Sequence, residues 1–212
     1  MADKIFKEYQ EQGAKGELLF RRWPLRAVCA PIIILRVAMS QIVLSTSGIA
    51  QIGTLLTNYF SQNTGEPYQY VGGTNNTVSW NVAPTAVVQA LKLIQQRMKD
   101  ALNMTSSFNE VLSAAYMEKQ KMAFHSDSER GLGPTVASLS LGSAAYMHFR
   151  LHAQYSDDLG KGSSRNALTL YLRHGDVVVM AGDGVQKFYE HTVVPVNFRI
   201  AATARSIDSS NH

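Results

Sequence analysis

The chain has 212 residues, of which 45% are hydrophobic and 17% are charged, and its net charge is +4. These values are ordinary for a globular protein of one domain, or one domain with an extension, that buries a core without cross-links. The single cysteine, Cys29, excludes a disulfide framework and a cysteine-based zinc site. It fits a reducing compartment, so we expect an intracellular protein, nuclear or cytoplasmic. The mild positive charge is compatible with nucleic-acid binding but does not demonstrate it.

The N-terminal part contains one strongly apolar stretch. The first 26 residues are too charged for a signal peptide, and residues 27–50 are the most apolar in the chain, with Arg36 among them. A membrane-spanning helix needs roughly 20 mostly apolar residues. We therefore expect a buried helix or pair of strands here, with no stable membrane association.

Helical patterns appear twice before residue 103. Residues 3–12 have the polar face of a surface helix, and residues 84–102 repeat apolar side chains at helical spacing after Pro84. Between them, residues 53–83 are rich in Gly, Asn, Thr and aromatic residues, which indicates a long loop or hairpin. This composition fits a binding segment and a solvated connector equally well.

From Phe108 onward the pattern is that of strands. Turn residues separate segments that read FNEVLSAAYM, KMAFHSD, TVASLSLGSAAYMHFRLH, ALTLYLRHGDVVVMAGD, FYEHTVVP and NFRIAATARSI. Many short strands with regular turns predict a mainly β protein with supporting helices (α+β), and a jelly roll is a natural way to close such a sheet.

A histidine and an aspartate stand two apart in MAFHSDSERGLGP, which begins at Met122. Residues i and i+2 of a strand point to the same face, so His125 and Asp127 offer a nitrogen and an oxygen to one point. A metal needs a third ligand, and His191 in FYEHTVVP follows a hairpin. Two histidines and one carboxylate leave open positions on the metal, as in the non-haem Fe(II) oxygenases.

Two arginines mark the last predicted strand. Arg199 and Arg205 are six residues apart, so both face the same side of the strand. An arginine that points into a barrel is costly unless it meets an anion, and its planar fork suits a carboxylate. The pair could hold the two ends of a dicarboxylate. Each motif alone is common by chance, but their combined order is much more specific.

Over residues 108–207 the chain resembles the AlkB family of dioxygenases that depend on Fe(II) and 2-oxoglutarate. FNEVLSAAYMEKQKMAFHSDSERGLGPTVASLSLG is close to the nucleic-acid-repair branch, and LYLRHGDVVVMAGDGVQKFYEHTVVP resembles the hairpin that carries the family's last histidine. VNFRIAATAR stands where the family has arginine, five residues and arginine. The overall texture is similar to that of fungal members.

The resemblance implies a double-stranded β-helix and a role for each matching residue. His125, Asp127 and His191 would bind iron. Arg199 would pair with the distal carboxylate of 2-oxoglutarate, Arg205 would lie near its C1 end and the metal-bound aspartate, and the Tyr116 hydroxyl would hydrogen-bond to it. Residues 1–100 would form an N-terminal extension with helices and a candidate substrate-lid loop, and residues 101–212 the catalytic core.

Three departures from the family pattern bear on the substrate. Ala114 replaces an asparagine that binds the co-substrate, and Ser128 replaces an acidic residue that commonly helps to read the damaged base. The N-terminal half, where the family has its substrate lid, matches poorly. Candidate substrate residues are Trp80, which could stack on a flipped base or simply pack in the core, together with Tyr70 and Glu129.

The resemblance thus implies an enzyme that consumes 2-oxoglutarate and O2. The first hypothesis for its activity is oxidative demethylation of N-methylated nucleobases in DNA or RNA, as in DNA repair, with nucleic acid as the partner. The second is hydroxylation of a small molecule or a protein side chain at the same iron site. The third is a non-catalytic binding module that retains the fold.

Overall fold

The structure is a computed structural model that describes residues 1–23, 56–67, 77–128, 131–156 and 164–208. The apolar segment 27–50 lies outside the described residues, and so do Tyr70 and Glu129. No helix in the described ranges is both long enough and apolar enough to cross a membrane.

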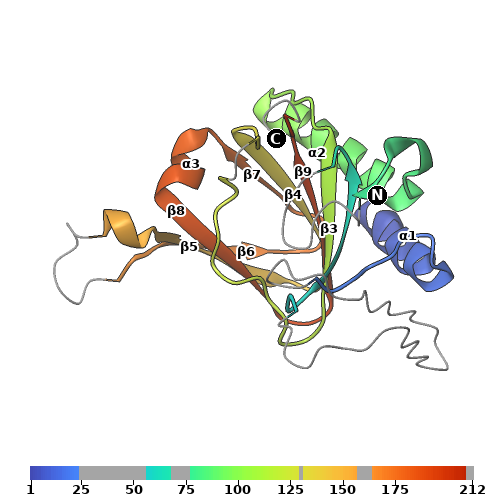
Figure 1. The fold of residues 1–212 in the computed structure, drawn as a ribbon, viewed down its shortest axis with the longest axis horizontal. Helices are drawn as coiled ribbons and strands as arrows, with labels where there is room; N and C mark the ends of the chain where they lie inside the picture. Colours follow the sequence, from blue (N-terminus) through green and yellow to red (C-terminus); the bar gives the residue numbers. More distant parts are fainter. Residues whose placement is uncertain (24–55, 68–76, 129–130, 157–163, 209–212) are drawn as a thin grey trace.

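The described strands form two sheets (Figure 1). The larger sheet contains β1 (Phe60–Gly65), β2 (Thr77–Val78), β3 (Glu110–Tyr116), β4 (Thr135–Gly142), β7 (Val177–Ala181) and β9 (Arg199–Arg205). Their order across the sheet is β2-β1-β3-β9-β4-β7. The smaller sheet contains β5 (Ala145–Leu151), β6 (Asn166–Leu172) and β8 (Tyr189–Pro195), in the order β6-β5-β8.

The chain crosses between the sheets four times, from β4 to β5, from β6 to β7, from β7 to β8 and from β8 to β9. Side chains from both sheets meet in a small apolar cluster that includes Val136 and Met180 from the larger sheet and Met147 and Phe149 from the smaller one. This arrangement is a double-stranded β-helix, or jelly roll, so the predicted fold class is confirmed.

Two helices cover the outer face of the larger sheet (Figure 1): α1 (Ala2–Lys15) and α2 (Thr85–Leu102). The main core lies between them and the sheet, where Ile94 and Met98 of α2 meet Ile200 and Ala202 of β9. The predicted apolar stripe of the second helix is therefore the buried face. Since β9 buries its even-numbered residues against the helices, its odd-numbered residues turn to the opposite face, between the two sheets.

Several local expectations were wrong. The predicted strand over residues 135–152 is two strands in different sheets, because Gly142 adopts a left-handed conformation (φ 89°) at the break. Residues 121–127 form no strand and only an isolated bridge at His125. Residues 53–83, expected to form a long loop or hairpin, contain β1, which pairs with the later strand β3. A short helix, α3 (Asp183–Phe188), follows β7 and was not expected.

Candidate metal centre

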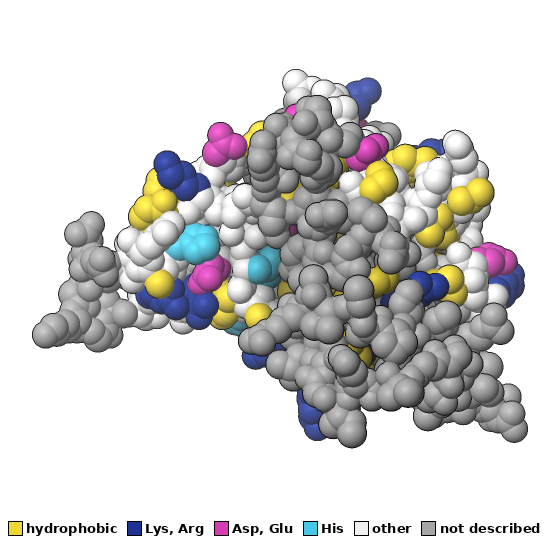
Figure 2. Space-filling model, in the orientation of Figure 1, with side chains coloured by type: hydrophobic (Ala, Val, Ile, Leu, Met, Phe, Trp, Pro, Cys, Tyr) yellow, Lys and Arg dark blue, Asp and Glu magenta, His cyan; other side chains and the backbone are white. Residues whose placement is uncertain are grey.

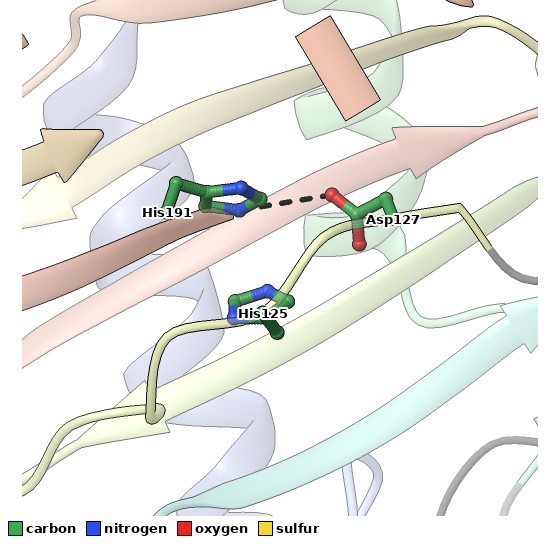
Figure 3. Close-up of side chains that lie close together, drawn as sticks. All are labelled: His125, Asp127 and His191. Atoms are coloured by element: carbon green, nitrogen blue, oxygen red, sulfur yellow. Dashed lines mark ion pairs between the residues drawn. The ribbon is translucent and has the colours of Figure 1, made fainter. Parts of the chain in front are cut away.

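Three potential metal ligands converge at one end of the smaller sheet (Figure 3). His191 projects from β8, and His125 and Asp127 come from the loop that lies beside it. One ligand atom from each residue lies within 4.8 Å of the others, and His191 Nε2 is 3.7 Å from Asp127 Oδ2. Two imidazoles and one carboxylate at this spacing fit a first-row metal with open coordination positions.

The loop that carries His125 and Asp127 is fixed to β8 by backbone hydrogen bonds. The His125 amide donates to the His191 carbonyl at 3.0 Å, and the His191 amide donates to the His125 carbonyl at 2.7 Å. The Thr192 hydroxyl also donates to the Met122 carbonyl at 2.6 Å. Although this loop is not a strand, the mutual bonds give the two histidines the side-by-side placement of a β pair.

A glutamine on α3 holds the aspartate. Gln186 is buried, and its Oε1 accepts a hydrogen bond from the Asp127 amide at 2.8 Å. Partners that hold a ligand-bearing segment commonly control metal affinity as strongly as the ligands do. Nothing in the sequence around Gln186 marks it, because its role depends on a short helix that was not predicted.

A hydrogen bond orients His125 for a metal, and burial keeps His191 uncharged. The His125 Nδ1 lies 2.9 Å from the Ala123 carbonyl, which can only accept, so Nδ1 carries the proton and Nε2 is left for a metal. Burial, with a smaller contribution from His125, lowers the pKa of His191 to about 4, against a weaker opposing effect of Asp127. The imidazole of His191 is therefore uncharged at neutral pH.

Arg150 contacts both segments that carry the histidines, through the residue that precedes each histidine. The Arg150 guanidinium lies 3.8 Å from the centre of the Phe124 ring, and its Nε donates to Glu190 Oε2 at 2.8 Å. Phe124 and Glu190 immediately precede His125 and His191. Arg150 thus ties together the outer sides of the two segments whose inner sides carry the histidines.

The triad opens onto a cavity of about 60 Å³ between the two sheets. The odd-numbered residues of β9 line one wall, so Arg199 and Arg205 share the cavity, as their spacing predicted. Tyr116 also lines it, directly opposite Arg199 across the β3–β9 pair. The predicted metal and co-substrate residues therefore meet in one cavity, which their sequence separation alone does not require.

Arg199 has the properties of an anion anchor. The residue is 2% exposed, and burial lowers the pKa of its guanidinium. Its Nη2 donates to the Ser140 hydroxyl at 3.0 Å, and its buried Nε has no hydrogen-bond partner among the residues that the structure describes. Arginine stays charged in proteins, and a buried cation with an unused donor is costly unless an anion meets it. A carboxylate in this cavity would satisfy it.

Arg205 already has an anion of its own. Its Nε and Nη2 donate to the two carboxylate oxygens of Glu110 at 2.8 and 3.0 Å, and both side chains are buried. The predicted place of Arg205 in the cavity agrees with the structure, but its guanidinium faces a partner from the chain itself. Glu110 was not predicted to be a site residue, although a glutamate in a strand of otherwise apolar and small residues indicates a special role.

The remaining predicted substrate residues are less central. Trp80 lines neither of the two cavities described here; its ring packs against the main core and its Nε1 donates to the Asn109 carbonyl at 2.8 Å. The structure thus favours core packing, the second reading that the sequence allowed. Ala114 lines the cavity, where it offers no side-chain donor.

Comparison with known proteins identifies the family. The family model for the 2OG-Fe(II) oxygenase superfamily matches residues 45–206, which is more than half of the chain. The chain belongs to this superfamily. The prediction of a 2-oxoglutarate-dependent non-haem iron dioxygenase is thereby confirmed, and Fe(II) and 2-oxoglutarate are its cofactor and co-substrate. No curated protein matches the chain.

Three solved structures resemble this oxygenase distantly. OsALKBH1 aligns with a TM-score of 0.44 and 16% identity, over 70% of this chain and 78% of the other. Peruvianin-I, a cysteine peptidase from Thevetia peruviana latex, aligns with a TM-score of 0.31 and 11% identity, over 46% and 50%. The conserved protein SPY1581 from Streptococcus pyogenes gives 0.31 and 12%, over 50% and 71%. Likenesses at these scores carry no information on substrate.

The residues present fit the family's metal and co-substrate. The donor set of two histidines and one carboxylate suits Fe(II), and His125, Asp127 and His191 would hold it. The buried, unsatisfied Nε of Arg199 suits one carboxylate of 2-oxoglutarate, and Tyr116 lies beside it with its ring centre 5.9 Å from the guanidinium carbon.

Proposed function

We propose that this oxygenase removes methyl groups from N-methylated nucleobases in DNA or RNA. The observation that carries the proposal is the position of Asp127, which lines two cavities at once: the narrow one with Arg199, and a second one of about 410 Å³. The second volume lies within the roughly 300–1,000 Å³ usual for small-ligand clefts. A co-substrate and a flat base could therefore approach the metal centre from separate sides.

A sequence resemblance supports a nucleobase as the substrate. Residues 108–142 resemble the nucleic-acid-repair branch of the AlkB family, including the stretch around His125 and Asp127 and the PTVASLSLG strand that follows it. Those motifs build the metal loop and β4, which line the cavities described above.

Basic side chains near the second cavity support a nucleic-acid partner. Lys187 and His152 line the cavity together with one acidic residue besides the metal ligand, Asp183. Arg150 and Arg165 both pair with Glu190, and so does His152 of the cavity lining. Figure 2 shows histidine, basic and acidic side chains gathered over β5 and β8, at the left of the molecule. Cations beside a catalytic pocket suit contacts with backbone phosphates, which position a nucleic acid without reading its sequence.

The geometry of the site gives a separate role to each group of residues. The three ligands hold the metal, Arg199 anchors 2-oxoglutarate, and the apolar side chains between the sheets keep water from the reacting groups. When bound, iron and 2-oxoglutarate would supply hydroxylation of a substrate C–H bond by O2, in which one oxygen atom enters the substrate and the other enters succinate, with release of carbon dioxide. A hydroxylated N-methyl group then leaves the base as formaldehyde, and the base nitrogen regains its proton.

One observation favours the second candidate, a small-molecule or protein oxygenase. Ser128 stands where the repair enzymes have an acidic residue, and it lines the second cavity. Its hydroxyl lies 2.8 Å from the Ser126 hydroxyl, so it offers a neutral group to the substrate where a base reader would offer a carboxylate. A less polar or differently charged substrate would meet this wall more favourably.

A panel of methylated oligonucleotides tests the proposal. Protein supplied with Fe(II), 2-oxoglutarate and ascorbate is incubated with single- and double-stranded DNA and RNA, each carrying one methylated base, and base masses are read with succinate. We expect a methyl mass to be lost from at least one base. The variant His191→Ala should abolish the loss, and His148→Ala should not, because His148 bonds to Thr169 on β6 and lines neither cavity. Succinate release with no change in any oligonucleotide would favour the second candidate.

A further inference from the structure

An ion pair between Glu110 and Arg205 reaches the wall of the co-substrate cavity through Arg205. Glu110 and Arg205 are direct partners in the β3–β9 ladder, and Arg205 lines the cavity. Asn63 of β1 donates from Nδ2 to Glu110 Oε1 at 2.6 Å, so the carboxylate receives donors from two neighbouring strands. A wholly buried carboxylate with three hydrogen bonds is a built feature of the sheet and not an accidental contact.

The two arginines of the cavity therefore differ in charge environment. Arg205 has its charge balanced by Glu110 at hydrogen-bond distance, whereas Arg199, among the residues that the structure describes, bonds through its guanidinium to the neutral Ser140. Tyr116 is the ladder partner of Arg199, and Glu110 is the ladder partner of Arg205. One end of the cavity is thus cationic and the other is electrically neutral.

We propose that Glu110 is an electrostatic positioning residue: it reserves Arg205 for an internal ion pair, so that Arg199 alone anchors 2-oxoglutarate. This replaces the two-arginine clamp that the family pattern implies. With Glu110 present, the charges of Asp127, Glu110, Arg199 and Arg205 cancel. A divalent metal and a dianionic co-substrate then enter together without leaving net charge in a buried site.

The charge of Glu110 should therefore act on the two ligands in opposite directions. Replacement by the uncharged Gln leaves the cavity with one extra positive charge. A dianion is then attracted more strongly, and a divalent cation is repelled. A purely structural role predicts something different, since a damaged cavity binds both ligands more weakly. Opposite changes in the two affinities therefore indicate an electrostatic role, and losses in both indicate a misfolded cavity.

The experiment titrates Mn(II), and then 2-oxoglutarate, into the full-length protein by calorimetry without any nucleic acid. We expect Glu110→Gln to bind 2-oxoglutarate about fivefold to tenfold more tightly and Mn(II) more weakly by a similar factor. A drop in affinity for 2-oxoglutarate, or no change for either ligand, overturns the proposal. Because the inference concerns the co-substrate side of the site, the nucleobase proposal can fail without affecting it.

A second variant covers the case in which Glu110→Gln fails to fold because Arg205 is left buried without its counter-charge. The double variant Glu110→Gln with Arg205→Gln removes both charges and leaves two amides that can bond to each other. It should bind 2-oxoglutarate within a few-fold of the wild type, whereas the benchmark Arg199→Gln should lose about a hundredfold. A loss in the double variant as large as that in Arg199→Gln would show that Arg205 contacts the co-substrate, and would refute the proposal.

Discussion

Replacement of Arg199 by methionine should make the protein more stable and less able to bind its co-substrate. The Arg199 side chain is buried; among the described residues its Nε has no hydrogen-bond partner, and its Nη2 donates to the neutral hydroxyl of Ser140. Buried cations without a counter-ion cost several kcal/mol, and well-packed apolar replacements of buried ionic groups stabilise proteins by about 1–4 kcal/mol. We expect a gain near the lower end, about 1–2 kcal/mol, because Ser140 and the Tyr116 ring already compensate part of the cost.

The loss in binding should be larger than this gain in stability. A buried carboxylate that loses its arginine partner typically costs about 2–4 kcal/mol, or roughly thirtyfold to a thousandfold in affinity. Differential scanning fluorimetry of the metal-free protein measures the first effect, which corresponds to about 2–4 °C per kcal/mol for a chain of this size. Calorimetry of 2-oxoglutarate into the Mn(II)-loaded protein measures the second.

Arg173→Met provides the matched control. Arg173 is an exposed arginine whose partner, Asp176, lies in the turn between β6 and β7, so its removal should change neither the melting temperature nor the affinity appreciably. Arg199 is not an unsatisfied anion anchor if Arg199→Met melts below the wild type or binds 2-oxoglutarate within a few-fold of it. Either result would mean that the cation is already satisfied in the absence of the co-substrate.

Three further predictions concern the metal loop and the sheet. Burial lowers the pKa of His191 from an ordinary 6.5 to about 4, so the unfolded chain takes up the proton first on acidification. Urea titrations of the metal-free protein should therefore show a loss in the free energy of unfolding of up to roughly 3 kcal/mol between pH 6.5 and 4. A free energy of unfolding that does not change over this pH range would contradict the burial argument. Gln186→Leu should weaken Mn(II) binding by about tenfold to a hundredfold, because the backbone amide of Asp127 loses the side-chain oxygen to which it donates. Unchanged Mn(II) affinity in an electron paramagnetic resonance titration would count against this. Gly142→Ala should cost about 2 kcal/mol or more in chemical denaturation, because φ is 89° and the new methyl would lie 2.8 Å from the Phe198 carbonyl oxygen; a wild-type midpoint would disprove it.

The metal centre could be predicted largely from the sequence because its signals are short and ordered. His125 and Asp127 stand at a spacing that places two ligands together, and His191 lies in the only later segment that combines a histidine with the family's hairpin pattern. Even so, the physical reason given for the spacing was partly wrong. The pair does not lie on a strand, and backbone bonds between His125 and His191 provide the alignment instead.

Features that depend on contacts between distant segments could not be predicted in this way. Glu110 and Arg205 are 95 residues apart, and their pairing is set by the register of β3 against β9, which no local pattern encodes. The contact of Gln186 with Asp127 likewise joins the helix α3 and a loop that the fold brings together. The switch between sheets at Gly142 follows from one left-handed residue inside an otherwise continuous strand pattern.

The most direct test of the account counts two products in one reaction. Purified protein is given Fe(II), 2-oxoglutarate and the methylated oligonucleotide that responds best in the panel, and formaldehyde and succinate are measured together over time. We expect formaldehyde to appear in step with succinate, in equal amounts, and the release of both to depend on the methylated base. Succinate that accumulates at the same rate without the oligonucleotide, with no formaldehyde formed, would contradict the proposal that this oxygenase demethylates nucleobases.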